Sequence, residues 1–151
     1  MYAPFLNLRT QQEYFDYYVN NYCSNPIYTH DGLPVYFDRD RFSHAFFKSV
    51  DRRSADKSQF DIERAKRMNW IKKVLQDPSL QIYAGYDNKK KKTDHSRRVS
   101  IVVPERYAVI VRFNRKFDKC FFVTAFIVDT DDNLNKLIQE EIWRMPTHFV
   151  Y

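Results

Sequence analysis

Residues 98–129 read RVSIVVPERYAVIVRFNRKFDKCFFVTAFIVD, and this stretch decides the fold. Its apolar residues follow a period near two, which indicates β-strands rather than helices. The connections at 104–106 and 115–119 are so short that consecutive strands must pair as antiparallel hairpins. With a further strand just before this stretch, we predict four strands, over residues 80–86, 98–103, 107–114 and 120–129. They would form a four-stranded antiparallel meander.

Before Pro78 the apolar period is close to that of an α-helix. Thr10 and either Asp38 or Asp40 have side chains that can cap helix starts, and Pro78 ends the helix that precedes it. We predict helices over about residues 10–22, from 38 or 40 to 50, 61–76 and 133–143. The fold class is therefore α+β, with N-terminal helices packed on the four-stranded antiparallel sheet and a C-terminal helix.

The length of 151 residues predicts a single domain over 1–151, with residues 1–30 as an N-terminal helical extension. Hydrophobic residues make up 44% of the chain, which excludes a disordered protein. Two glycines are too few for a glycine-rich phosphate loop, so P-loop and dinucleotide-binding proteins are excluded. No apolar run approaches the ~18 residues of a membrane span. Two distant cysteines, Cys23 and Cys120, favour a reducing cytoplasm.

Lys and Arg outnumber Asp and Glu by 25 to 19, which gives a net charge of +6. This excess either keeps the protein soluble or attracts a polyanion. It clusters in residues 88–98, NKKKKTDHSRR, which we predict to be a mobile basic loop. Such a cluster adds salt-dependent affinity for RNA without reading its sequence. The predicted nucleic-acid-binding residues are Lys89, Lys90, Lys91, Lys92, Arg97 and, on the third helix, Arg67.

His44 is the histidine most suited to proton transfer. It lies early in the second predicted helix, four residues before Lys48, so the two side chains would be neighbours. The charge of Lys48 would favour a neutral imidazole that can accept a proton. An ordinary surface histidine is the alternative. On the third helix, Arg64 and Arg67 share a face, which is either solvated or a fork that binds phosphate.

Thr124 lies in a strand that is otherwise apolar on both faces, so its hydroxyl needs a partner. That partner is either a neighbouring strand or a ligand at the open face of the sheet. The acidic run at 129–132, DTDD, is explained by helix capping. No spacing typical of a zinc or calcium site occurs, so we expect neither a metal ion nor a cofactor.

Three features together resemble one protein family. A helix with a histidine comes first, and the string RAKRMNWIKKVLQDPSLQIY follows at 64–83. A sheet with a basic second strand comes next, and a late strand contains threonine in FVTAF, at 122–126. Over residues 35–129 this order resembles the phage-associated branch of the barnase–EndoU–colicin–RelE superfamily, whose members are metal-independent ribonucleases.

The resemblance implies a domain of that superfamily which cleaves RNA by transesterification without a cofactor. A base would take the proton of the 2′-OH, cations would stabilise the phosphorane, and an acid would protonate the leaving oxygen. The implied catalytic residues are His44 as acid or base, Arg64 and either Arg97 or Arg98 at the phosphorane, Lys48 in support, and Thr124 at a phosphate oxygen. A second acid or base would be His95, Tyr83 or Tyr86.

The sequence therefore favours an endoribonuclease that acts on RNA, with tRNA among its candidate targets, as a toxin or phage-related effector. An antitoxin or immunity protein would then be a partner. Two alternatives stay open. One is a non-catalytic nucleic-acid-binding protein that uses the same basic surface, and the other is an inhibitor or interaction module with a tyrosine-rich surface.

Overall fold

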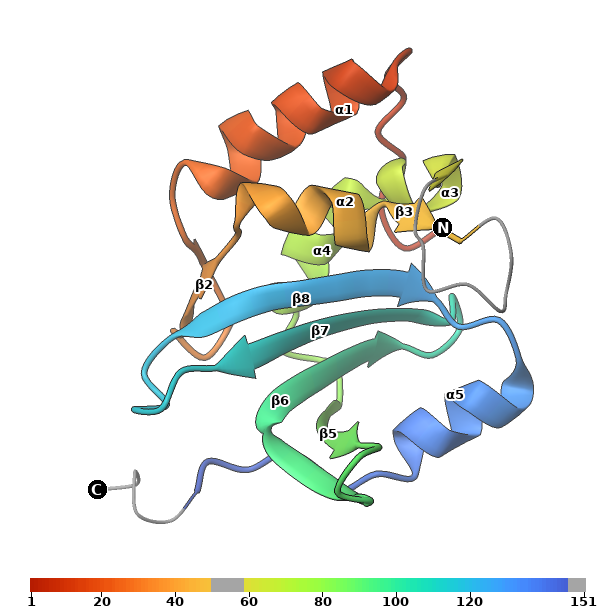
Figure 1. The fold of residues 1–151 in the computed structure, drawn as a ribbon. Coiled ribbons are helices and arrows are strands. Elements are labelled where there is room, and N and C mark those ends of the chain that lie inside the picture. Colours follow the sequence, from red (N-terminus) through yellow and green to blue (C-terminus); the bar gives the residue numbers. More distant parts are fainter. Residues whose placement is uncertain (50–58, 147–151) are drawn as a thin grey trace.

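The computed structural model describes residues 1–49 and 59–146, which form a sheet with helices on both faces (Figure 1). Within these residues six strands make one mixed sheet, in the order β1-β2-β8-β7-β6-β5. A separate two-stranded sheet pairs β3 with β4. The strands are β1 (Ile27–Tyr28), β2 (Pro34–Tyr36), β3 (Phe47–Lys48), β4 (Gln59–Phe60), β5 (Ile82–Asp87), β6 (Lys92–Val102), β7 (Tyr107–Phe113) and β8 (Cys120–Ile127).

The prediction of a four-stranded antiparallel sheet is wrong. Strands β5 to β8 are antiparallel neighbours, but the sheet continues past β8. There β2 pairs with β8 in parallel, with Val35 opposite Cys120, and β1 pairs antiparallel with β2. These two strands contain two and three residues, which is too short for a period of two to be recognised. Their addition makes the sheet mixed.

The helices are shorter than their apolar patterns predict. They are α1 (Gln11–Tyr18), which continues as a π-helix (Val19–Cys23), a 3₁₀ turn (Arg39–Arg41) that leads into α2 (Phe42–Ala45), α3 (Ile62–Ala65), α4 (Met68–Leu75) and α5 (Asp131–Ile138). Two predicted caps are confirmed, since Thr10 accepts a hydrogen bond from the Glu13 amide and Asp38 accepts one from the Asp40 amide. Asp61 also caps α3, where it accepts from the Glu63 and Arg64 amides.

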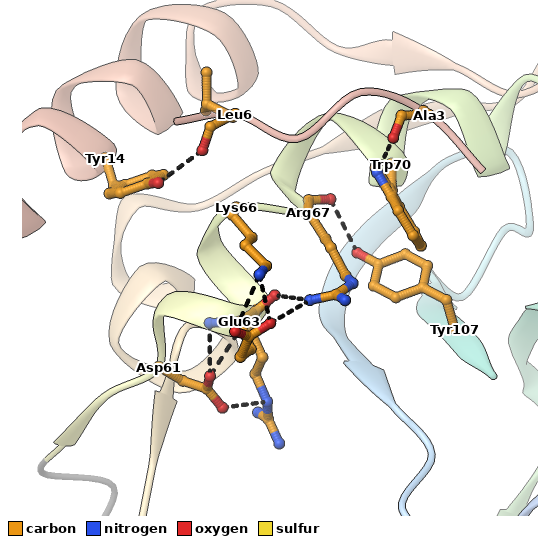
Figure 2. Close-up of polar contacts among 10 residues, drawn as sticks. Ala3, Leu6, Tyr14, Asp61, Glu63, Lys66, Arg67, Trp70 and Tyr107 are labelled. Atoms are coloured by element: carbon orange, nitrogen blue, oxygen red, sulfur yellow. Dashed lines mark hydrogen bonds and ion pairs between the residues drawn. The ribbon is translucent and has the colours of Figure 1, made fainter. Parts of the chain in front are cut away.

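The predicted helix over 61–76 is divided into α3 and α4 by the N-terminal arm, residues 1–8. The Leu6 amide donates to the Lys66 carbonyl at 2.7 Å, which in a continuous helix would accept from the Trp70 amide. The Trp70 amide donates to the Arg67 carbonyl at 2.9 Å instead. Figure 2 shows the arm crossing this break, where the Trp70 indole donates to the Ala3 carbonyl at 2.8 Å. The arm therefore occupies backbone groups that a continuous helix would use.

Helices α1, α2 and α4 lie over one face of the sheet, and α5 lies on the other (Figure 1). The larger core lies under the first three and includes Tyr14, Tyr18 and Tyr22 of α1 and the π-helix, whose side chains are buried and cannot stack on bases. A smaller core, formed around Val99, Ile101 and Leu134, lies under α5. Because α5 has eight residues, it covers only part of its face of the sheet.

The C-terminal segment runs along the outer side of β5. The Ala84 amide donates to the Glu141 carbonyl at 2.7 Å, and the Trp143 amide donates to the Ile82 carbonyl at 3.0 Å. This segment satisfies backbone groups that an edge strand otherwise exposes. Across the described ranges, no helix has the length and apolarity needed to cross a membrane.

Candidate functional site

A groove of about 950 Å³ opens on the sheet face that α5 partly covers. Three basic side chains line it from distant parts of the chain, namely Arg64 of α3, Arg97 of β6 and Lys136 of α5. Its walls also contain apolar side chains of the sheet and the carboxylates of Asp129 and Glu140. We name this space the basic groove. Two of the arginines predicted to contact phosphate, Arg64 and Arg97, therefore both line this groove.

Arg64 is positioned by the start of α3. Its Nε lies 3.4 Å from an Asp61 carboxylate oxygen, and its Nη1 donates to the Phe47 carbonyl at 3.5 Å. The Asp61 amide in turn donates to the Phe46 carbonyl at 2.8 Å. These bonds join the start of α3 to the end of α2, which carries His44. His44 and Arg64 therefore lie on adjoining segments, although His44 is exposed and does not line the groove.

Lys48 does not pair with His44 as a helical neighbour, and that expectation is wrong. Helix α2 ends at Ala45, and Lys48 lies in β3 opposite Gln59. The chain leaves the helix here because Phe46 and Phe47 pack against other rings, Phe42 and Phe60 among them. Lys48 is exposed and follows Phe47, whose carbonyl contacts Arg64. Lys48 does not line the groove, although its neighbour Phe47 contacts Arg64.

A bulge in β6 positions Arg97. Gly85 pairs with Asp94 while Ala84 pairs with Arg98, so residues 95–97 are extra on the β6 side. A Cβ atom at Gly85 would lie 2.8 Å from the Cβ of Arg97, closer than two such atoms can approach. The absence of a side chain at Gly85 lets Arg97 cross it toward the groove. A glycine within a strand marks a bulge or a close approach of this kind.

The Thr124 hydroxyl makes no hydrogen bond within residues 1–49 and 59–146. Its Oγ1 is buried and has no hydrogen-bond partner in the described part of the chain. Thr124 lies directly opposite Ile110, a groove-lining residue, so both side chains project from the same sheet face. The predicted hydrogen bond from Thr124 to a neighbouring strand is therefore not formed. The Thr124 side chain therefore projects from the groove face of the sheet, and its hydroxyl is buried just beneath that surface.

Arg98 lies on the opposite face of the sheet from Arg97. Its side chain is 3% exposed, and its guanidinium lies 3.1 Å from Asp31 and over the ring of Trp143. Burial by itself raises the pKa of Asp31, but the hydrogen bond from Thr29 and the charge of Arg98 outweigh it and hold that pKa below its usual value. Of the two arginines proposed at the phosphorane, the geometry therefore favours Arg97.

The buried ion pair leads to a prediction about stability. Asp31→Asn should destabilise the protein by roughly 1–3 kcal/mol at neutral pH, because Arg98 would stay buried without its counter-charge. Since the folded pKa of Asp31 is lowered, its contribution is present above the unfolded value of about 3.9 and is lost as pH falls through the folded value. Urea unfolding from pH 7 to pH 2 measures both effects. An Asn variant as stable as the parent at pH 7 would contradict this assignment.

The remaining predicted nucleic-acid-binding residues divide into two groups. Arg67 donates to the Glu63 carbonyl at 2.7 Å (Figure 2). It lies over the rings of Phe5 and Trp70 and does not line the groove. The lysines occupy the β5–β6 hairpin and are all exposed. The prediction of a loop over 88–98 is wrong beyond residue 91, because β6 already begins at Lys92.

Among the three candidates for a second acid or base, Tyr86 borders the groove, from β5. His95 lies 3.3 Å from a Glu141 carboxylate oxygen in the C-terminal segment. The free cysteines are poor nucleophiles, because burial raises the pKa of both and brings that of Cys120 to about 12. No cluster of three metal-ligating side chains occurs within residues 1–49 and 59–146.

Comparison of the chain with protein-family models, curated proteins and solved structures gave no match. The resemblance to the ribonuclease superfamily thus stays a prediction from the quoted strings. Sequence reasoning also missed residues that line the site, including Lys136 and Gly85. The apolar period of residues 133–143 could have placed Lys136 on one side of a helix, but nothing in that pattern shows which sheet face the helix covers.

Proposed function

We propose that this chain is an endoribonuclease that binds RNA in the basic groove and cleaves it without a metal ion. The observation that carries the proposal is that Arg64 of α3 and Arg97 of β6 line the same groove. Guanidinium groups bind two phosphate oxygens at once, and they stabilise the charge that develops when phosphorus becomes five-coordinate. The Thr124 hydroxyl, which is buried and has no partner among the described residues, would add a neutral donor at the same sheet face.

The proposed reaction is an internal transesterification. A base removes the proton of the ribose 2′-OH, whose oxygen attacks the adjacent phosphorus. The bond from phosphorus to the 5′ oxygen breaks, an acid protonates that oxygen, and a 2′,3′-cyclic phosphate remains. His44 is the proposed acid or base, because its helix adjoins Arg64. Tyr86 is the proposed partner, because it lines the groove. Lys48 would attract the RNA backbone from β3.

The test is incubation of the purified protein with total RNA and with tRNA in the presence of EDTA. We expect fragments whose 3′ ends carry a cyclic phosphate, which end mapping identifies. RNA that is bound but never cut, in EDTA or with added Mg²⁺, would reject the enzyme and favour the non-catalytic RNA-binding alternative. If RNA is neither bound nor cut, the enzyme and the RNA-binding protein are both rejected, and the protein-interaction module is the hypothesis that remains.

The cellular setting belongs to the same proposal. The proposed ribonuclease would act as a toxin or phage-related effector, with an antitoxin or immunity protein as its partner. Such a partner would be acidic where it covers Arg64, Arg97 and Lys136. The free thiols of Cys23 and Cys120 support a reducing compartment such as the cytoplasm.

The lysines of the β5–β6 hairpin should control affinity rather than chemistry. Replacing Lys89, Lys90, Lys91 and Lys92 with Gln removes exposed charges at the end of the sheet. The salt dependence of RNA binding should become shallower, by roughly 0.7 in the log–log slope for each phosphate that the protein no longer neutralises. Single-turnover cleavage at saturating RNA should change little. Lys72→Gln, on α4 and exposed beyond the opposite sheet face, is the control for a change in net charge. A collapse of the saturated rate would instead make the hairpin part of the catalytic site.

A further inference from the structure

We infer that the sheet face between β6 and β2 is a base-stacking subsite for single-stranded RNA, adjacent to the basic groove. This inference rests on the proposed function and extends it, because it states that the substrate is unpaired and where a base next to the bound phosphate lies. The rings that would stack on bases, those of Phe121 and Tyr36, have no proposed role in catalysis. Binding of bases at this face and cleavage in the groove can therefore be tested separately.

Four neighbouring strands contribute one side chain each to a continuous row. Arg97 of β6 lies opposite Arg112 of β7, which lies opposite Phe121 of β8. Phe121 lies opposite Tyr36 of β2. Directly opposed residues in a sheet project from the same face, so the four side chains form one row, which we name the stacking row.

The rings and charges of the stacking row are in contact. The Phe121 and Tyr36 ring centroids are 6.1 Å apart, and the Arg112 guanidinium lies 4.8 Å from the Phe121 centroid. The Lys119 ammonium lies 5.9 Å from the centroid of the Tyr36 ring. Tyr36 is 41% exposed and Phe121 is half-buried. Exposed aromatic rings next to arginines are the arrangement with which single-strand-binding proteins hold bases, whatever the base.

The charge of this face favours an anion. A pocket of about 250 Å³ beside the row is lined by three arginines, Arg41, Arg97 and Arg112, and by one acid, Asp38. Arg97 and Arg112 are directly opposed like charges, which repel each other. Arg97 has a weak partner in Asp94 at 3.6 Å, and Arg112 makes no ion pair with any residue that the structure describes. A phosphate bound between the two guanidinium groups would relieve this repulsion.

Arg97 connects the two sites, because it lines both the basic groove and the pocket beside the stacking row. A phosphate held by Arg97 would leave one neighbouring nucleotide in the groove and the other over Phe121 and Tyr36. A base can stack on these rings only if it is neither paired with another base nor stacked within a nucleic-acid helix. Single-stranded RNA meets that condition, whereas the bases of duplex RNA stay stacked inside the helix.

The test compares three probes by fluorescence anisotropy. Each is an oligomer of about 12 nucleotides, which falls within the usual site sizes. One is single-stranded 2′-O-methyl RNA, which cannot be cleaved because it has no free 2′-OH. The second is the same backbone without bases, and the third is the 2′-O-methyl duplex. We expect Phe121→Leu and Tyr36→Leu each to weaken binding of the single strand by about tenfold. Binding of the abasic probe and of the duplex should not change.

Tyr28→Leu is the matched control, because Tyr28 is an exposed tyrosine of β1 outside the stacking row. If Phe121→Leu unfolds, Tyr36→Leu carries the test, since the exposed Tyr36 ring contributes little to the core. Equal weakening of the base-bearing and abasic probes, or none in either variant, would overturn the subsite while leaving RNA binding in the groove intact. Failure of the parent protein to bind any probe would overturn the subsite and the proposed function together.

Discussion

His44→Ala and Arg64→Ala are each expected to lower the single-turnover cleavage rate by about 10²-fold or more, the usual effect of losing an acid–base group or a charge-stabilising donor. The double variant should be much less impaired than the product of the two effects, because residues that act on one phosphate work as a unit. Melting temperatures should change little, since His44 is exposed and Arg64 lies at the groove.

His30→Ala is the control for this series, because His30 is also exposed but lies in the turn between β1 and β2 and not on α2, the helix that adjoins Arg64. Its cleavage rate should equal that of the parent. If His44→Ala cleaves at the parent rate while Arg64→Ala does not, the groove is the site but the proton is moved by another group, with Tyr86 the first to test. Strictly multiplicative effects would show that His44 and Arg64 do not share a phosphate.

Trp70→Ala should lower the free energy of unfolding by about 3–5 kcal/mol. The Trp70 side chain is 1% exposed, stacks on Phe5 with centroids 5.7 Å apart, and meets the edge of Tyr107 at 5.3 Å. Its removal would leave a cavity where the N-terminal arm joins α4 and the sheet. The Ala3 carbonyl would also lose its hydrogen bond from the indole. Denaturant unfolding of the purified variants measures the loss.

Two further variants separate the contributions at this position. Trp70→Phe keeps a ring but loses the bond to Ala3, so its loss should be smaller, with the bond itself worth about 1 kcal/mol. Trp143→Ala, at a partly exposed tryptophan of the C-terminal segment, should be the mildest. A Trp70→Ala protein that unfolds like the parent but fails to bind RNA would show that Trp70 contacts the ligand.

The sequence predicted the strands β5 to β8 because each has at least six residues and is bounded by turn residues. It could not predict the pairing of β2 with β8, because a three-residue strand leaves no period and its partner is far along the chain. The helices were overestimated for a related reason. The spacing of apolar residues does not reveal that the Leu6 amide hydrogen-bonds the Lys66 carbonyl, where α3 is separated from α4.

The candidate site was predictable in its residue types but not in its geometry. Adjacent residues of a strand face opposite sides, so either Arg97 or Arg98 had to face away from the groove. Which one does is decided by the bulge opposite Gly85 and by the burial of Arg98 against Asp31, and both are long-range features. Arg112 and Phe121 stand next to each other only through the register of β7 and β8.

The pairing of β2 with β8 also constrains how the chain folds during synthesis. The aromatic side chains of α1 and the π-helix, Tyr14, Tyr18 and Tyr22, share their core with Val111, Cys120 and Phe122. A nascent chain that has emerged from the ribosome only as far as α4 therefore has no sheet on which to bury these rings. Such delayed, non-local contacts slow folding and prolong the time for which apolar surface is exposed to other chains. We therefore expect native protection of these tyrosines to be gained late in translation, after β8 has left the exit tunnel.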